Sequence, residues 1–240
     1  MLASGFDPSG LRRVLAIGCH ADDIEIGCGA TLLTLVRSHP EVQVTWVVLA
    51  ATGGRAEEAR RGAAAFLGED GRHEVRVHEF RDAYLPYGAT AVKEAFEALK
   101  DVGPDLVLTH TSDDRHQDHR LAHDLTWNTF RNHLILEYEV PKYDGDLGRP
   151  NVFVPVSEEL AREKTALLES TFGSQRGKDW FDETVFLGLM RIRGVEIRSP
   201  TGYAEAFHCR KVRMSLELSA RSVSKITTIA LEPTSNVAAT

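Results

Sequence analysis

The feature that most constrains the fold is the alternation of short apolar runs with longer segments of helical composition. The apolar runs are rich in Val, Leu and Ile and lie at residues 13–18, 42–50, 74–80 and 105–110. Segments rich in Ala, Leu, Glu and Arg with helical spacing lie between them, at 28–38, 56–67 and 91–100. Strands that alternate with helices form parallel sheets covered by those helices. The sequence therefore predicts an α/β fold: a Rossmann-like, doubly wound, mostly parallel sheet with helices on both faces.

The rest of the chain extends this domain. A helix is expected at 116–131, strands at 134–140 and 152–156, and another helix at 157–171. Residues 172–199 are mixed and basic, and we expect them to cover the substrate. A length of 240 residues fits a single α/β domain, which we assign to 1–214. Residues 215–240 contain no aromatic residue and many Ser, Thr and Ala, so a partly disordered tail is expected there.

Charge and composition exclude several classes of protein. The formal net charge of -7 argues against a general nucleic-acid binder, which normally carries a basic field. No apolar run reaches the length of a membrane span, and the N-terminus lacks a signal-peptide pattern. Cys19, Cys28 and Cys209 form no C-x-x-C pair and fit a reducing cytoplasm. Thiolates can bind zinc, but for Cys19 and Cys28 we favour a role as buried packing residues. We therefore expect a cytoplasmic protein that acts on a small molecule, with homo-oligomer formation left open.

A histidine and two adjacent carboxylates follow the first predicted strand, in the stretch His20-Ala21-Asp22-Asp23. Ligands and catalytic groups gather where parallel strands end, so this position suits metal chemistry. The same residues have a simpler interpretation, because Asp at a helix start commonly accepts a hydrogen bond from an unpaired backbone N–H. So short a motif does not by itself decide between the two.

A second cluster follows the fourth predicted strand, from His110 to the run His116-Gln117-Asp118-His119. In a helix that begins near His116, the side chains of His116 and His119 lie on one face. Taken alone, this cluster could be the solvated start of a helix with exposed histidines. Both clusters, however, follow predicted parallel strands, so they converge on one edge of the sheet. Their combination favours a shared metal site.

The two motifs resemble those of a known family, the zinc-dependent N-acetylglucosaminyl deacetylases of the LmbE/PIG-L type. The first family motif, H-P-D-D before a Gly-rich helix start, resembles residues 20–29, and the second, H-x-D-H, resembles residues 116–119. The resemblance extends over residues 14–210, including Ser174-Gln175 and the Tyr-Ala-Glu-Ala-Phe run at 203–207. Ala21 replaces the usual proline and Ala30 a common second glycine. Both differences affect backbone shape rather than a reacting group.

The resemblance implies that His20, Asp23 and His119 bind Zn2+. Two imidazoles and one carboxylate make a three-ligand site that leaves room for water, as catalytic zinc requires. Asp22, which is next to a ligand in the sequence, would then be the general base that takes the proton of that water.

The second cluster would supply the groups around the reacting carbonyl. If protonated, His116 is the candidate donor that stabilises the tetrahedral oxyanion, and Asp118 is close enough in the sequence to orient that imidazole and keep it charged. Asp118 also has an interpretation as an ordinary acidic residue in the first turn of a helix. His110 and Asp114 are expected to complete the surroundings of the site.

Arg55 and Asp82 resemble family positions that hold sugar hydroxyl groups. A bidentate guanidinium and a carboxylate acceptor suit a polyhydroxylated ring. Each has a simpler interpretation, Arg55 as an exposed charge at a helix start and Asp82 as a turn residue. The late basic residues could receive a phosphate or carboxylate on the rest of the substrate, or form a solvated surface; they are Arg176, Lys178, Arg191 and Arg193.

Together with these residues, the resemblance implies a Zn2+-dependent hydrolase that removes the N-acetyl group from a GlcNAc-containing small molecule. Two other functions fit part of the pattern. A non-catalytic sugar- or nucleotide-binding module could use the same fold, although Gly27-x-Gly29 lacks the third glycine of a dinucleotide site. A mononuclear Fe(II) oxygenase could use two histidines and one carboxylate, although such enzymes usually have antiparallel jelly-roll folds.

Overall fold

The structure, a computed structural model, describes residues 10–213 of the chain. The described residues as far as Arg210 belong to one compact unit. The predicted tail at 215–240 lies outside the described residues. Within the described range, no helix is both long and apolar enough to cross a membrane.

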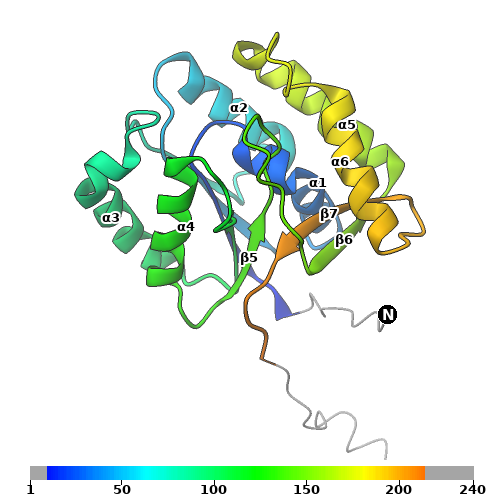
Figure 1. The fold of residues 1–240 in the computed structure, drawn as a ribbon. Helices are drawn as coiled ribbons and strands as arrows, with labels where there is room; N and C mark the ends of the chain where they lie inside the picture. Colours follow the sequence, from blue (N-terminus) through cyan, green and yellow to red (C-terminus); the bar gives the residue numbers. More distant parts are fainter. Residues whose placement is uncertain (1–9, 214–240) are drawn as a thin grey trace, which may run out of the picture. The chain divides into compact units, whose positions relative to one another are not determined.

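A seven-stranded sheet runs through this unit in the order β3-β2-β1-β4-β5-β7-β6 (Figure 1). The strands are β1 (Arg13–Gly18), β2 (Gln43–Val48), β3 (Glu74–Val77), β4 (Leu106–His110), β5 (Leu134–Tyr138), β6 (Val152–Val156) and β7 (Tyr203–His208). Strands β1 to β5 pair in parallel, whereas β7 is antiparallel to its neighbours β5 and β6. The prediction of a doubly wound, mostly parallel sheet is confirmed.

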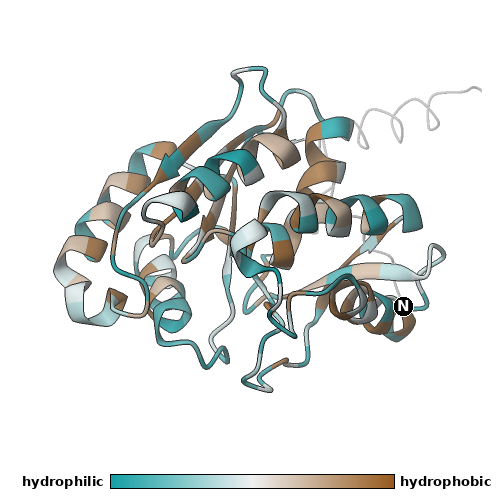
Figure 2. Ribbon diagram, turned by 90° about the horizontal axis from the view of Figure 1, so that it is seen from above, coloured by the Kyte–Doolittle hydropathy of each residue, from teal (hydrophilic) through white to brown (hydrophobic). Residues whose placement is uncertain are grey.

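Helices cover both faces of the sheet. They are α1 (Asp23–Ser38), α2 (Gly54–Leu67), α3 (Ala89–Ala98), α4 (Gln117–Thr129), α5 (Glu158–Thr171) and α6 (Glu183–Glu196). Side chains of β1 alternate between two buried clusters: Val14 and Ala16 join the one that contains residues of α1, α2 and α5, and Leu15 and Ile17 join the one that contains residues of α3 and α4. Burial on both faces explains the continuous apolar strands. Figure 2 shows hydrophilic and hydrophobic residues alternating along the helices, as expected of helices packed on one side.

Helix α1 begins at Asp23, directly after the turn that follows β1, rather than at residue 28 as its apolar spacing predicted. In that turn Asp22 has a φ of 134°, a conformation that L-residues rarely adopt. Cys28 has non-helical dihedral angles, φ -145° and ψ 19°, and divides the helix into two parts. The spacing of apolar residues therefore predicted only the part of α1 that follows Cys28.

Two elements near the C-terminus were not identified from the pattern. Helix α6 lies within residues 172–199, which the composition described only as mixed and basic. Strand β7 lies between β5 and β6 and pairs with both. Its sequence combines Tyr203 and Phe207, which favour strands, with two alanines and a glutamate, which do not. Pairing with a strand on each side therefore supports a strand conformation that the local sequence signals only in part. Strand β3 ends at Val77, earlier than predicted.

Gly27 of α1 provides a test of this packing. A Cβ atom built on Gly27 would overlap the ring of Tyr138, so Gly27→Ala should lower the free energy of unfolding by about 1–3 kcal/mol, the usual cost of overpacking. Gly188→Ala in α6 is the matched control, because its Cβ position is open and alanine should stabilise that helix by about 0.5–1 kcal/mol. Urea unfolding measures both variants, and equal effects would contradict the proposed contact with Tyr138.

Candidate metal centre and active site

The carboxyl ends of β1 and β4 bring the two predicted clusters together. The turn after β1 carries His20 and Asp22 and leads into α1 at Asp23, while β4 ends at His110. His116 precedes α4 as its N-cap residue. His20 and His119, which are 99 positions apart in the sequence, thereby come into contact. This edge of a parallel sheet is where ligand sites are expected.

Three side-chain atoms at this edge form a nearly equilateral triangle. His20 Nδ1 lies 3.1 Å from His119 Nε2 and 3.4 Å from Asp23 Oδ2, and the third side, from His119 Nε2 to Asp23 Oδ2, is 3.3 Å. Ligands held about 2.0–2.1 Å from a tetrahedral Zn2+ ion lie about 3.3 Å from one another. The spacing of these three atoms therefore fits the ligand set expected from the sequence.

Carboxylates orient both imidazoles of the triangle. His119 Nδ1 lies 2.8 Å from Asp114 Oδ2 and donates to it, which leaves the lone pair of Nε2 facing the triangle. His20 Nε2 lies 3.1 Å from Asp82 Oδ1 and 3.3 Å from Asp118 Oδ2, so its Nδ1 faces the same point. Carboxylates in this position set the tautomer and ring orientation of metal-binding histidines.

His110 lies beside the triangle as a supporting group. Its Nε2 accepts a hydrogen bond from the Cys19 backbone N–H at 3.1 Å, and its ring stacks on His119 with centroids 3.9 Å apart. Burial, with His119 nearby, lowers the pKa of His110 to about 4, so the ring is neutral at pH 7. Burial also raises the pKa of the Cys19 thiol well above its usual value. A protonated thiol agrees with the expectation that Cys19 is a packing residue.

Asp22, the residue before Asp23, contacts Arg55. Its Oδ1 accepts a hydrogen bond from Arg55 Nη2 at 3.1 Å. Arg55 also donates to Ala21 O, to Glu58 Oε2 and to Ser174 Oγ. Burial raises the pKa of Asp22 to about 7, while Arg55 opposes the shift. A carboxyl group with a pKa near neutrality can accept and return a proton at physiological pH.

Asp118 has a different partner from the one assigned by sequence. Its carboxylate accepts hydrogen bonds from the backbone N–H groups of Ala83 at 2.8 Å and Leu85 at 3.1 Å, and its Oδ2 lies against His20 Nε2. Asp118 therefore orients His20, whereas the sequence suggested that it orients His116. The reason is that the first turn of α4 directs this carboxylate toward the loop after β3.

His116 is held instead through its own ring nitrogen. Nδ1 accepts a hydrogen bond from the Asp118 backbone N–H at 3.3 Å, which leaves the hydrogen of the neutral ring on Nε2. Burial and the neighbouring imidazoles of His119 and His20 lower the pKa of His116. The ring can therefore donate a hydrogen bond as a neutral imidazole. The prediction of a protonated His116 differs from this arrangement.

The predicted substrate contacts lie at the border of the site. The Asp82 side chain is 74% exposed and the Arg55 side chain 26% exposed. The late basic residues donate to protein groups: Arg176 to Glu169 O, Lys178 to Gln175 Oε1, Arg191 to Gly202 O and Arg193 to Glu139. Their pairing argues against a basic surface directed at a substrate.

Three side chains that contact the site were given no role from the sequence. Ser174 Oγ donates to Glu58 Oε2 at 2.6 Å, and both contact Arg55. Lys142 lies 3.0 Å from Asp114 Oδ1, on the side of that carboxylate away from His119. Ser174 was noted only as part of a family-like pair, and Lys142 lies between two predicted strands, outside both motifs.

Solved structures share this fold at low sequence identity. N,N'-diacetylchitobiose deacetylase from Pyrococcus horikoshii superposes with a TM-score of 0.66 and 22% identity, covering 84% of this chain and 85% of that one. GalB, the 4-carboxy-2-hydroxymuconate hydratase from Pseudomonas putida KT2440, has a TM-score of 0.67 and 17% identity, covering 87% of this chain and 100% of that one. One fold thus accompanies two different reactions, and sequence comparison must establish the family.

Sequence comparison identifies one family. The PIG-L family, described as GlcNAc-PI de-N-acetylase, matches residues 15–130, which include both motifs. The chain is also 30% identical over 170 residues to the uncharacterized deacetylase YaiS of Escherichia coli (strain K12), a match that covers 66% of this chain and 89% of that protein. The chain therefore belongs to the PIG-L family of LmbE-like deacetylases.

Proposed function

We propose that this protein is a zinc-dependent hydrolase that removes the N-acetyl group from a GlcNAc-containing small molecule in the cytoplasm. The observation that carries the proposal is the triangle of His20 Nδ1, Asp23 Oδ2 and His119 Nε2, with sides of 3.1–3.4 Å. A bound Zn2+ ion would supply Lewis-acid chemistry, polarising the acetamide carbonyl and lowering the pKa of a water to about 7. The parallel sheet argues against the Fe(II) oxygenase alternative.

Asp22 is proposed as the general base. It is buried, lies next to the ligand Asp23 in the chain, and is held by Arg55 Nη2 at 3.1 Å. Arg55 and the Ala21 carbonyl fix the direction of this carboxylate, so Asp22 takes a proton from the attacking water and returns it to the leaving amine. Proton transfer by a positioned group contributes about 10²- to 10⁴-fold to the rate.

His116 is proposed as the donor that stabilises the oxyanion. Because its Nδ1 accepts from the Asp118 backbone N–H, its Nε2–H is available to the substrate. Such a donor typically contributes about 10²- to 10³-fold. Asp118 is proposed to act through His20, whose ring it orients. Asp118 thus remains a supporting residue of the site, but its partner is His20 instead of the expected His116.

Arg55 and Asp82 are proposed to contact the sugar. Asp82 offers an exposed carboxylate next to His20, and Arg55 retains a partly exposed guanidinium next to Asp22. An acetylated amino sugar is also the substrate named for the N,N'-diacetylchitobiose deacetylase that shares the fold. The carrier of the sugar could be a nucleotide, a thiol precursor, a lipid or another metabolite.

Release of acetate provides the direct test. Incubation with a panel of N-acetylglucosaminyl conjugates should release acetate from at least one, and a chelator should abolish the release because His20, Asp23 and His119 lose their ion. Added Zn2+ should restore it. Metal analysis of the purified protein identifies the native ion. Tight sugar binding without acetate release would instead support a binding module, and bound iron with 2-oxoglutarate turnover would support the oxygenase.

Asp22→Asn and Asp23→Asn form a matched pair of variants. Asp22→Asn should reduce kcat by about 10²- to 10⁴-fold, because the amide cannot accept the proton, while Zn2+ affinity is retained. Asp23→Asn should weaken Zn2+ binding itself, because a neutral amide replaces a ligand carboxylate. Chelator competition and acetate release together separate the two effects. Unchanged turnover of Asp22→Asn with zinc bound would show that another group is the base.

A further inference from the structure

The break in α1 lies between the residues of one helical hydrogen bond. In an uninterrupted α-helix the Ala30 N–H would donate to the Ile26 carbonyl. Cys28, between them, has non-helical dihedral angles. The short N-terminal part of α1 contains Asp23 and follows directly on Asp22, so the break determines how this part is directed relative to the rest of the helix.

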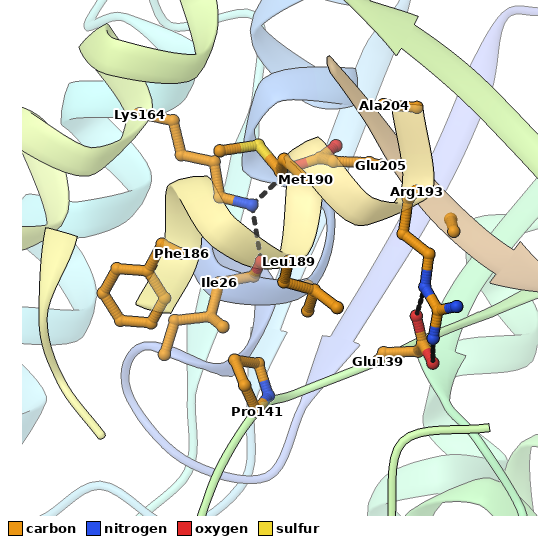
Figure 3. Close-up of a pocket in the computed structure, with 12 residues that line it drawn as sticks. Ile26, Glu139, Pro141, Lys164, Phe186, Leu189, Met190, Arg193, Ala204 and Glu205 are labelled. Atoms are coloured by element: carbon orange, nitrogen blue, oxygen red, sulfur yellow. Dashed lines mark hydrogen bonds and ion pairs between the residues drawn. The ribbon is translucent and has the colours of Figure 1, made fainter. Parts of the chain in front are cut away.

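A buried ion pair binds the two backbone groups on either side of the break, Ile26 O and the Ala30 N–H. Lys164 Nζ donates to Ile26 O at 2.5 Å and to Glu205 Oε1 at 2.6 Å (Figure 3). Glu205 Oε1 in turn accepts from the Ala30 N–H at 2.9 Å. The two backbone groups that such a helical bond would join are therefore each bound by one member of the pair. Side chains inserted into the hydrogen-bond ladder are a known cause of sharp helix kinks.

The second oxygen of Glu205 extends this arrangement. Glu205 Oε2 accepts from the Thr31 N–H at 2.6 Å, so one carboxylate binds both of the first two amides after the break. Negative charge at the start of a helix is also favourable to the helix dipole. Lys164 comes from α5 and Glu205 from β7, and their side chains are only 3% and 2% exposed.

Burial of this ion pair carries a desolvation cost. Taking two charges out of water is often no better for stability than replacing both by apolar groups of similar size. The backbone groups that the pair binds are thus of more interest than its contribution to stability. It holds Ile26, whose backbone N–H donates to the Asp22 carbonyl at 2.9 Å. Ile26 thus links Lys164 directly to the turn that carries Asp22 and Asp23.

We propose that Lys164 and Glu205 are positioning residues for the metal and base site. They keep α1 open at Cys28, so that its first turn places Asp23 Oδ2 opposite His119 and Asp22 beside it. This inference rests on the proposed function for the roles of Asp22 and Asp23. Without the pair, the Ala30 N–H and the Ile26 carbonyl are free to re-form their helical bond, and a straighter α1 redirects both aspartates.

The test is the double variant Lys164→Met/Glu205→Met. It removes both charges at nearly constant volume, so thermal stability should stay close to that of the parent. Its Zn2+ affinity, measured by chelator competition, should fall by about 10- to 100-fold, as is usual when supporting residues of a metal site are lost. Its crystal structure should show the Ala30 N–H bonded to Ile26 O.

A second ion pair in the same pocket supplies the control (Figure 3). Arg193 Nη2 and Nε bind Glu139 at 2.6 and 2.9 Å, with side chains 7% and 3% exposed. Arg193→Met/Glu139→Met makes the same change at side chains that hydrogen-bond to Gly148 and Glu196 instead of the α1 backbone and should leave Zn2+ affinity unaltered. An equal loss of affinity in both double variants, or an α1 that remains broken without Lys164 and Glu205, overturns the proposal.

The proposed function and the positioning role of the ion pair can fail independently. If the parent protein binds no Zn2+, the proposed function fails, whereas the course of α1 in the Lys164→Met/Glu205→Met structure still decides what the ion pair does. If Zn2+ binds and acetate is released, the affinity difference between the two double variants decides it in solution as well.

Discussion

The Asp23 carboxylate is the group on which the site depends. Its Oδ2 lies 3.3–3.4 Å from ring nitrogens of His20, His110 and His119 and accepts a hydrogen bond from the His20 backbone N–H at 2.7 Å. Burial alone would raise the pKa of Asp23, but these imidazoles lower it well below its usual value. One carboxylate oxygen thus connects β1, β4 and α4. Its place at the first position of α1 makes the course of that helix a condition of the site.

Each imidazole of the triangle is contacted by different carboxylates. Asp114 binds His119 and is itself paired with Lys142, while Asp118 and Asp82 face His20. Each carboxylate takes one nitrogen of a ring and leaves the other directed at the triangle. A metal ion bound at the triangle would meet imidazoles whose tautomers are already set, so little reorganisation would be required to bind it.

Much of this arrangement follows from local sequence. The alternation of strands and helices predicts the parallel sheet, and the positions of His20 and His119 after two of its strands predict their convergence. Other features depend on partners that are remote in sequence. The break at Cys28 requires Lys164, 138 positions from Ile26, and Glu205, 175 positions from Ala30. Neighbouring residues carry no signal for such an insertion. The partner of Asp118 was likewise decided by the loop after β3, which supplies the Ala83 and Leu85 amides.

Arg55 illustrates why the fold alone does not determine the reaction. A hydratase and a deacetylase share this fold, so the chemistry depends on how individual groups are balanced. Burial raises the pKa of Asp22, and Arg55 draws it back to about 7. A divalent cation beside Asp22 would lower this pKa further and favour the carboxylate, which is the form a general base requires. Arg55 donates through Nη1 to Glu58 and Ser174 and through Nη2 to Ala21 and Asp22, so a substrate hydroxyl bound at Nη2 would compete with Asp22 for that nitrogen. The proposed sugar contact and the strength of the proposed base would then be coupled through one guanidinium group.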